Sequence, residues 1–472
     1  MPLRVALPKG RLLPTTATLL QKSKWAVGSY TEKSRLYRLQ AKRFPELQVR
    51  IFQEKDIPIQ VAIGNYDLGI CGLHWIDELL VKFHSSAVVK VKNLNYSRGK
   101  LTVVANGSQN ITTVNDLKAQ TQVIRIASEF PNLAEHFAVT NRFRQFNIFP
   151  LWGGAEVYPP ESADLALISL EGGKIFSDHK LVSISTILDH SAFLIANRQS
   201  LESKDMSELL TSLYEGLTFL HKDAEVSKQP TTRLMIEKKS FVPQASTRTI
   251  WLALPDGHQK EPTAELLNKT GISVDGYSTK IGNHRLTTNL ADVLVKVVRP
   301  QDMPLQVANK NFDLAITGKD WLQEHLSQFP TSPVVELLDL KFGWVKVVAV
   351  ISMDLTVSDI HELRSLNNNR NRPLRVASEY VNIADKYARD NHLGLYQVIP
   401  TWGATEAFLP EDADLLIENT KTGQTIARHN LKIIDTLFDS AACLIGHRDV
   451  PNEKVERINK ITQMLRSTAE EE

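Results

Sequence analysis

Cysteine, net charge and long apolar runs are all scarce in this sequence. Only two of the 472 residues are cysteines, Cys71 and Cys443, which is too few for a disulfide framework. No stretch approaches the roughly 18–20 uninterrupted apolar residues that cross a bilayer, and the first residues lead directly into a strand-like run, unlike a signal peptide. The formal net charge of +2, without an aromatic-basic stripe, gives no reason to expect a nucleic-acid partner. We therefore expect a cytoplasmic protein that binds neither nucleic acid nor membrane.

An internal repeat organises the chain. Segments of the first half return in the second half in the same order. The pairs are Ala6-Leu7-Pro8-Lys9-Gly10 with Ala253-Leu254-Pro255-Asp256-Gly257, Asp67-Leu68-Gly69-Ile70 with Asp313-Leu314-Ala315-Ile316, and Arg125-Ile126-Ala127-Ser128-Glu129 with Arg375-Val376-Ala377-Ser378-Glu379. The spacing stays between 246 and 250 residues, as from Lys55 to Gln301 and from Arg125 to Arg375. Collinear matches of this kind indicate a tandem duplication.

The repeat predicts the domain boundaries. We expect a first copy at 1–222, a linker at 223–247 and a second copy at 248–472. Each copy is expected to form two lobes. In the first copy these are 1–95 with 180–222, and 96–179; in the second they are 248–340 with 430–472, and 341–429.

Short apolar runs alternate with helical patterns inside each copy. The expected strands of the first copy are Leu3–Pro8, Val49–Phe52, Asp67–Ile70, Leu101–Ala105, Arg125–Ala127, Asp164–Ile168 and Ala192–Ala196. The expected helices are Leu19–Lys24, Trp75–Phe83 and, after the second lobe, Met206–His221, which Asn452–Arg466 matches in the second copy. Strands separated by helices predict an α/β fold with parallel-rich sheets, and two small lobes predict a ligand cleft between them.

One loop in the second copy has the residue types of a phosphate site. A buried run ends at Glu418, and a short Thr/Gly loop with Thr422, Gly423 and Thr425 precedes a helical pattern. Backbone N–H groups and hydroxyls suit a phosphate, and a carboxylate at a strand end suits vicinal sugar hydroxyls. This favours a ribose-5-phosphate site. The alternative is a Thr-rich helix cap whose Glu418 faces solvent, and spacing alone does not decide between them.

Several of these motifs resemble one enzyme family. They are Ala6-Leu7-Pro8-Lys9-Gly10-Arg11-Leu12, the Asp56-Ile57-Pro58 and Asp302-Met303-Pro304 turns, Asp313–Asp320, Ser191–Arg198 and the Thr422–Thr425 loop. Together they resemble ATP phosphoribosyltransferase, at the size of its short, two-domain catalytic form and over nearly all of both copies. The resemblance implies two tandem copies of a two-lobed, type II periplasmic-binding-protein-like module.

The resemblance also implies a reaction. Family members join ATP to phosphoribosyl pyrophosphate (PRPP) with Mg²⁺, giving phosphoribosyl-ATP and pyrophosphate in the first step of histidine biosynthesis. Such a step depends on positioning and charge neutralisation, and no metal site made by the protein alone is assigned. The partners it implies are ATP and PRPP, with further self-association or a histidine-pathway regulatory subunit.

The site residues that the resemblance implies fall in both copies. The PRPP-binding set is Glu418, Asn419, Thr422, Gly423, Gln424 and Thr425; the phosphate- or nucleotide-binding set is Lys9, Gly10, Arg11 and Lys319; the catalytic arginines are Arg35, Arg285 and Arg299. The arginine that Arg299 matches acts on a neighbouring subunit's site in the family, so a tandem copy is expected to be a fused dimer.

The two copies have lost different parts of this set. Ile168, Gly172 and Ile175 occupy the positions of Glu418, Thr422 and Thr425, although Lys174 could still attract an anion. Conversely, Asp256 and His258 replace Lys9 and Arg11 in the second copy, and Gln53 replaces Arg299 in the first. Two hypotheses follow: an enzyme with at most one PRPP cradle, in the second copy, or an impaired ligand-binding or regulatory relative.

Each residue also has a purely structural alternative. Lys9, Arg11, Arg35 and Arg285 could be solvated surface cations. Trp152 and Trp402 are more often core aromatics than adenine-stacking groups, and the two cysteines are best interpreted as small buried hydrophobic residues. A two-lobed solute-binding protein shares the implied fold, but that class predicts an export or lipid-anchoring signal.

Overall fold

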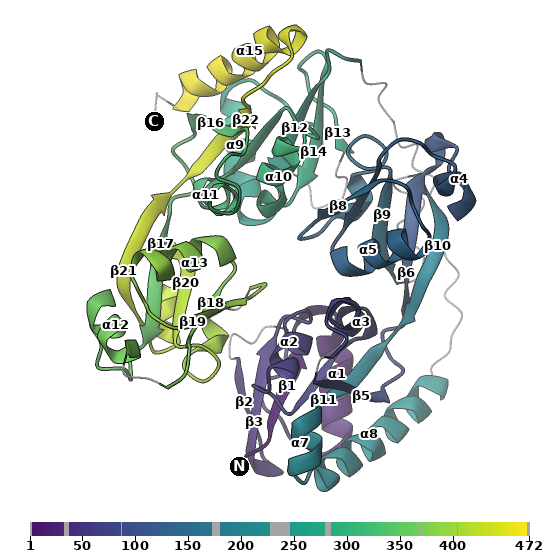
Figure 1. Ribbon diagram of the computed structural model, residues 1–472, viewed down its shortest axis with the longest axis vertical. Helices are drawn as coiled ribbons and strands as arrows, with labels where there is room; N and C mark the ends of the chain where they lie inside the picture. The colour runs from purple at the N-terminus through teal and green to yellow at the C-terminus, as the bar shows by residue number, and fades with distance from the viewer. Residues whose placement is uncertain are drawn as a thin grey trace. The chain divides into compact units, whose positions relative to one another are not determined.

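Two similar halves follow one another along the chain (Figure 1). The computed structural model describes residues 2–32, 37–85, 87–171, 180–226, 246–278, 285–368, 371–403 and 405–469. Arg35, the first-copy loop residues Gly172, Lys174 and Ile175, and residues 227–245 of the predicted linker lie outside these ranges.

The first copy contains a six-stranded and a five-stranded sheet. The six strands run in the order β2 (Arg38–Ala41), β3 (Phe44–Phe52), β1 (Arg4–Pro8), β4 (Leu68–Gly72), β11 (Ala192–Asn197) and β5 (Val88–Asn93). The five strands run in the order β10 (Leu181–His190), β6 (Gly99–Asn106), β9 (Leu165–Leu170), β7 (Ile124–Ser128) and β8 (Phe146–Pro150). Its helices are α1 (Leu13–Lys22), α2 (Ile57–Ala62), α3 (Leu73–Lys82), α4 (Val114–Lys118), α5 (Pro131–Thr140), α7 (Arg198–Ser203) and α8 (Ser207–Val226), with 3-10 turns η1 (Gly10–Leu12), η2 (Gly107–Gln109) and η3 (Ala155–Val157).

The second copy repeats this arrangement. Its six strands are β13 (Arg285–Leu286), β14 (Val293–Val298), β12 (Ile250–Pro255), β15 (Leu314–Gly318), β22 (Ala442–His447) and β16 (Val334–Asp339). Its five strands are β19 (Tyr396–Pro400), β18 (Leu374–Ser378), β20 (Leu415–Thr420), β17 (Val345–Ser352) and β21 (Leu431–Ser440). The helices are α9 (Lys260–Lys269), α10 (Met303–Ala308), α11 (Lys319–Gln328), α12 (Ile360–Asn368), α13 (Val381–Asp390), α14 (Gln424–Arg428) and α15 (Asn452–Ala469), with η4 (Gly257–Gln259), η5 (Pro300–Asp302) and η6 (Thr405–Phe408).

The strand connections identify the architecture. In each six-stranded sheet, the strand that comes first along the chain pairs in parallel with both of its neighbours. β1 pairs in this way with β3 and β4, and β12 with β14 and β15. The strand that returns from the five-stranded sheet, β11 or β22, pairs antiparallel on both sides. The chain therefore crosses between the two sheets twice in each copy. This is the predicted α/β fold, with two tandem copies of a two-lobed, type II periplasmic-binding-protein-like module.

Most predicted elements of the first copy coincide with observed ones. All seven expected strands overlap strands, and the helices expected at Trp75–Phe83, Met206–His221 and Asn452–Arg466 overlap α3, α8 and α15. The helix expected at Leu19–Lys24 was placed too late. It begins at Leu13, because Pro14 in the first turn has the backbone φ that a helix start needs, and it ends at Lys22, before Lys24 adopts a left-handed φ of 59°.

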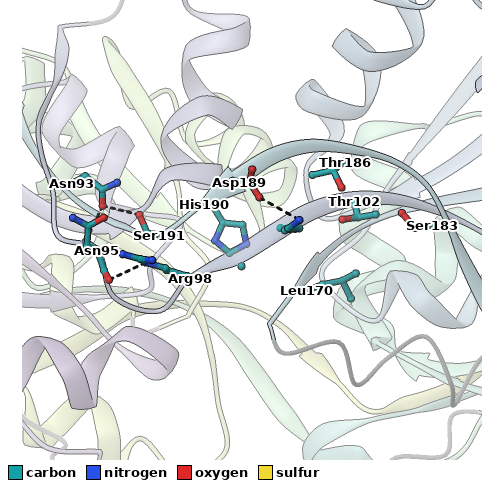
Figure 2. A pocket seen from close by; sticks show the side chains of 12 residues that line it. Asn93, Asn95, Arg98, Thr102, Leu170, Ser183, Thr186, Asp189, His190 and Ser191 are labelled. Carbon is teal, nitrogen blue, oxygen red and sulfur yellow. Dashed lines mark hydrogen bonds and ion pairs between the residues drawn. The ribbon is translucent and has the colours of Figure 1, made fainter. Parts of the chain in front are cut away.

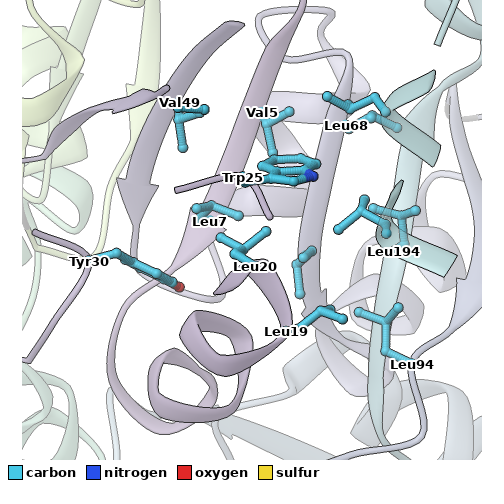
Figure 3. Packing of buried hydrophobic residues seen from close by; sticks show 14 of the residues in the cluster. Val5, Leu7, Leu19, Leu20, Trp25, Tyr30, Val49, Leu68, Leu94 and Leu194 are labelled. Atoms are coloured by element: carbon cyan, nitrogen blue, oxygen red, sulfur yellow. The ribbon is translucent and has the colours of Figure 1, made fainter. Parts of the chain in front are cut away.

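The hydrophobic core beside the six-stranded sheet of the first copy shows why the apolar runs were informative. Side chains of β1, α1 and neighbouring strands pack together there (Figure 3). Trp25 is fully buried among them, and its Nε1–H donates to Oγ of Ser212 in α8 at 2.8 Å. The only polar atom of the indole is thereby satisfied, which is the usual condition for burying tryptophan. Trp25 and Ser212 thus fix α8 against α1.

Two compact units divide the chain, and each contains a short segment of the other copy. One unit comprises 1–149, 165–240 and 402–407; the other comprises 150–164, 241–401 and 408–472. In the second unit, Oδ1 of Asp302 accepts a hydrogen bond from the Trp152 backbone N–H at 2.8 Å, and the Trp152 ring lies edge-on to Trp321. Residues 150–164 therefore pack as part of the unit that contains most of the second copy.

Within the part of the chain that the structure describes, no helix has both the length and the apolar character needed to cross a membrane.

Candidate functional site

The Thr/Gly loop of the second copy lies where β20 ends and α14 begins. The first three residues of β20 are buried, whereas Glu418, Asn419 and Thr420 at its end are half-buried. Gly423 precedes α14 with a left-handed φ of 70°, a conformation that favours glycine, and its N–H donates to Oγ1 of Thr420 at 2.9 Å. Thr422 and Thr425 are exposed, so their hydroxyls face solvent and are available to an anion.

Helix α14 itself adds little to this loop. It spans only Gln424–Arg428, and a helix of little more than one turn has few aligned peptide dipoles. The N–H of Gln424 lies 3.5 Å from Oγ1 of Thr422, a long contact that a ligand oxygen could replace. The capacity of the loop to hold an anion therefore depends on its threonine hydroxyls and local N–H groups.

Asn419 belongs to a buried hydrogen-bond chain that the sequence analysis did not predict. Its side-chain amide donates to the Tyr380 hydroxyl at 2.7 Å, and that hydroxyl donates to Oδ2 of Asp320 at 2.5 Å. Oδ1 of Asp320 accepts from Ser440 Oγ at 3.0 Å, and Ser440 Oγ accepts the Asp320 N–H at 3.0 Å. Burial, and then the Asp320 carboxylate, raises the pKa of Tyr380, so the phenol stays protonated and can donate.

This chain joins α11 to the five-stranded sheet. Asp320 is in the first turn of α11, Tyr380 directly precedes α13, and Asn419 and Ser440 end β20 and β21. The side chain next to Glu418 is thereby held by groups from four elements. Asp320 ends the family-like Asp313–Asp320 motif and Tyr380 directly follows the repeated segment Arg375–Glu379, but nothing in their spacing indicated that they touch.

The first copy has four different residues at these positions. Strand register pairs Leu101 with Ser169 as it pairs Val347 with Asn419, and Gly99 with His190 as it pairs Val345 with Ser440. The equivalents of Asn419, Tyr380, Asp320 and Ser440 are Ser169, Phe130, His74 and His190. Phe130 has no hydroxyl, so the chain is broken; instead the His74 ring lies 5.2 Å from Phe130 and 4.2 Å from His190, between centroids.

The same register supports the predicted loss of the cradle acid in the first copy. Thr102 pairs with Ile168, as Val348 pairs with Glu418. Ile168 is buried and has no polar atom in its side chain. The predicted loop differences at Gly172 and Ile175 lie outside the described residues.

Lys9 and Arg11 are engaged with different protein groups. Lys9 Nζ lies 3.3 Å from the Tyr37 hydroxyl and over its ring, at 5.1 Å from the centroid. Arg11 forms ion pairs with Glu54, at 2.8 Å, and with Glu171. Gly10 between them has a left-handed φ of 76°, a conformation that favours glycine. Both predicted phosphate- or nucleotide-binding cations therefore contact other groups of the protein in this conformation.

Arg299 pairs with the residue that replaces Lys9. Its guanidinium lies 3.4 Å from Oδ2 of Asp256, and about half of the Arg299 side chain is exposed. At the position where the first copy has the cation Lys9, the second copy thus has an anion that pairs with Arg299. The pair is largely solvated, so its contribution to stability is small.

Lys319 is held by two carboxylates. Its Nζ lies 2.8 Å from Asp339 and 3.1 Å from Glu336. Partial burial alone would lower the pKa of Lys319, but hydrogen bonds to Asp339 and Glu336 outweigh it, so the pKa is raised. In this conformation Lys319 is directed at β16, and a phosphate would have to displace two carboxylates to reach it.

Arg285 contacts residues 157–161, which belong to the first-copy segment 150–164 of the same compact unit. Its guanidinium donates to the carbonyls of Val157, at 3.2 Å, and Pro159, and to Glu161 Oε2, at 2.9 Å. Glu161 Oε2 also lies 3.0 Å from Nζ of Lys296, whose side chain is fully buried. Desolvation raises the pKa of Glu161, but Lys296 and Arg285 more than compensate and lower it.

The strand register also corrects the predicted pairing of Arg35 with Arg285. Arg285 lies opposite Lys296, whereas in the first copy Arg38 lies opposite Arg50. Arg38 therefore occupies the position of Arg285. Both Arg35 and Arg38 precede a leucine, so local sequence could not distinguish them. Arg35 itself lies outside the described residues.

Comparison with known proteins identifies relatives of both copies. The family model described as HisG, ATP phosphoribosyltransferase, matches residues 53–217 and again 299–467. An ATP phosphoribosyltransferase of Prosthecochloris aestuarii is 30% identical over 231 residues, which cover 47% of this chain and 72% of the relative. One of Saccharolobus solfataricus is 30% identical over 229 residues, covering 46% and 72%.

Similar solved structures have low overall similarity scores. The ATP phosphoribosyl transferase (HisG:HisZ) complex from Thermotoga maritima is 21% identical with a TM-score of 0.38, covering 47% of this chain and 99% of that one. The periplasmic aliphatic sulphonate binding protein SsuA from Escherichia coli is 16% identical with a TM-score of 0.31, covering 48% and 75%.

Proposed function

Because the chain belongs to the ATP phosphoribosyltransferase family, we propose that it joins ATP and PRPP to give phosphoribosyl-ATP and pyrophosphate, the first step of histidine biosynthesis. We propose further that the chain is a fused pseudo-dimer with at most one PRPP cradle, in the second copy. The observation that carries this proposal is the segment at the end of β20, where half-buried Glu418 is followed in the next loop by solvent-facing Thr422 and Thr425.

The cradle residues have complementary roles in this proposal. Glu418 accepts hydrogen bonds from the ribose hydroxyls, and the hydroxyls of Thr422 and Thr425 donate to the 5-phosphate. The adenine N1 of ATP attacks the anomeric carbon as pyrophosphate leaves, so the protein supplies positioning and charge neutralisation without a nucleophile of its own. The chain from Asn419 through Tyr380 to Asp320 holds the cradle wall in place.

Mg²⁺ fits this proposal as a companion of the substrate. Among the described residues, no three His, Cys, Asp or Glu side chains are grouped so that they could hold a metal ion. Protein sites for Mg²⁺ commonly use one or two carboxylates with substrate phosphates, and Glu418 is the carboxylate of this loop. When bound, the ion would neutralise charge on the departing pyrophosphate.

A second candidate function has its own support. Asp256 pairs with Arg299 of the implied catalytic set, and Lys319 of the implied phosphate- or nucleotide-binding set is bound by Asp339 and Glu336, so both cations are engaged with protein groups. Removing one charge-assisted contact to a transition state lowers a rate on the order of 10²–10³-fold. These contacts favour an impaired relative that binds PRPP, or that regulates a separate catalytic chain, with little turnover. Further self-association or a histidine-pathway regulatory subunit stays a prediction.

One assay separates the two functions. The purified full chain is mixed with ATP, PRPP and Mg²⁺, phosphoribosyl-ATP is followed by its absorbance, and PRPP binding is measured in parallel. We expect product that disappears in the Thr422→Val, Thr425→Val variant. No product above background, with PRPP still bound, would reject the enzyme and leave the binding protein. If PRPP does not bind at all, the proposed cradle is wrong.

A further inference from the structure

A polar cavity lies in the first copy where the chain crosses between its two sheets. Its volume is about 760 Å³, within the usual range for small-molecule sites. Asn93, Asn95, Arg98 and Ser191 gather at one end, Thr102, Ser183 and Thr186 at the other, and the His190 ring lies between them (Figure 2). Gly99, Lys100, Leu170 and Asp189 complete the lining.

Cations and a hydroxyl form a stripe along this cavity. Lys100 and Thr102 alternate along the start of β6, so their side chains project from the same face of the strand, and Arg98, directly before β6, also lines the cavity. Thr186 and Asp189 on β10 lie opposite Thr102 and Lys100. The Lys100–Asp189 separation is 3.9 Å and both side chains are mostly exposed, so this pair is weak and does not neutralise the cation.

The second copy lacks some of these polar groups, although Lys346, Thr436 and Asp439 keep the residue types of Lys100, Thr186 and Asp189. Strand register places Val348 at the position of Thr102 and Ile433 at that of Ser183, and the chain offset places Trp344 at that of Arg98. At these three positions the first copy has a cation and two hydroxyls where the second copy has apolar or aromatic side chains, on the sheet face where Ile168 stands in place of Glu418.

His190 is built into the wall of the cavity. It is 3% exposed, its Nε2 lies 2.8 Å from Oγ of Ser169, and its buried Nδ1 has no hydrogen-bond partner. Gly99, which pairs with His190, leaves room for the imidazole, because a Cβ at this position would lie 2.6 Å from the ring. The second copy has Val345 at the position of Gly99 and Ser440 at the position of His190. A buried ring nitrogen without a partner is costly unless a ligand or water satisfies it.

We propose that this cavity is a second small-molecule site, which binds a phosphate monoester such as a sugar phosphate. A dianionic phosphate matches the two cations Arg98 and Lys100, whereas a single carboxylate would leave one unmatched. Thr102, Ser183 and Thr186 offer hydroxyls to the rest of the ligand. Because the lining comes from both crossing strands, a bound ligand contacts the hinge of the first copy. The proposal does not depend on catalysis by the second copy.

Binding to a chain with a disabled second-copy cradle tests this proposal. In the Thr422→Val, Thr425→Val background, ribose 5-phosphate is titrated by calorimetry, with ribose as the control for the phosphate and citrate as the control for carboxylates. We expect ribose 5-phosphate to bind and ribose and citrate not to. Adding Arg98→Ala and Lys100→Ala should weaken binding at least tenfold. Lys346→Ala, at the second-copy position of Lys100, should leave it unchanged.

Each alternative outcome rejects the proposal. If ribose 5-phosphate does not bind in this background, there is no second site. Equal affinity with and without Arg98 and Lys100 places the ligand elsewhere, and equal binding of citrate shows a site for anions in general. Lys100 is 65% exposed and Arg98 is also at the surface, so both variants should fold, and their thermal unfolding is measured alongside.

Discussion

The hydroxyl of Tyr380 lies 2.5 Å from Oδ2 of Asp320 and links that carboxylate to Asn419, next to Glu418. The first copy has Phe130 in place of Tyr380, and there the equivalent link does not exist. The Tyr380 hydroxyl is therefore the group through which Asp320 and Asn419 are connected in the second copy.

We expect Tyr380→Phe to weaken turnover or PRPP binding about tenfold. The variant keeps the ring but leaves the Asn419 amide without its acceptor, and losing such a buried hydrogen bond costs roughly 1–3 kcal/mol. Steady-state rates and PRPP titrations measure the effect. Tyr387→Phe is the matched control, because its hydroxyl donates to Asp435 at 2.8 Å in the same lobe, away from the loop. Equal losses in both variants would indicate a general effect on folding.

The two cradles should respond differently to mutation. Thr422→Val with Thr425→Val should abolish PRPP binding, because valine keeps the shape of threonine but removes both hydroxyl donors. Gly172→Val, at the first-copy position of Thr422, should hardly change it. Equilibrium binding of PRPP to the full chain measures both, and similar losses would contradict a single cradle in the second copy.

Glu161→Gln should strongly destabilise the unit that contains it. The substitution leaves the fully buried Lys296 without its carboxylate, and breaking a buried pair costs roughly 3–5 kcal/mol. Urea unfolding followed by fluorescence measures the loss. As a control, Asp292→Asn removes an exposed partner of Arg457 and should cost no more than about 1 kcal/mol. If both variants lose the same stability, the Glu161 contact is not the buried ion pair described here.

Glu78→Gln should change how stability depends on pH. Glu78 accepts the N–H groups of Asn132 and Leu133 at the start of α5, and burial raises its pKa to about 7. A carboxyl with a raised pKa holds its proton more tightly when folded, so stability falls as pH rises from about 4.5 to about 7. Glutamine does not titrate, so the variant does not lose this stability as the pH rises. Its free energy of unfolding relative to that of the parent should therefore increase by up to about 3 kcal/mol across this range.

Urea unfolding of both proteins at pH 5 and pH 8 measures this difference. Glu324 makes the equivalent contacts with Asn382 and Ile383 and also has a raised pKa, but it is present in both proteins and cancels in the comparison. A stability difference that is the same at the two pH values would show that Glu78 does not titrate in this range.

Local patterns were sufficient for most strands and failed at specific places. β4 is a short apolar run and β1 is one after its first residue, Arg4, and such runs indicate buried strands. β10 was missed because its exposure does not alternate cleanly: it pairs with β6 through two register shifts, which break the period of two. The start of α1 was missed because its apolar positions were counted without the proline signal at Pro14.

The sequence by itself determined the duplication, the α/β fold and the positions where the two copies differ, such as Ile168 against Glu418. These features depend on residue order and on apolar periodicity, which are local properties. Tertiary structure decided what each charged side chain contacts. Arg11 is bound by Glu171 and Arg285 by Glu161, and both pairs join residues more than one hundred positions apart. Such partners are selected by how strands and loops pack, so only the folded chain could show that Arg38 takes the place of Arg285 and that Tyr380 reaches Asp320.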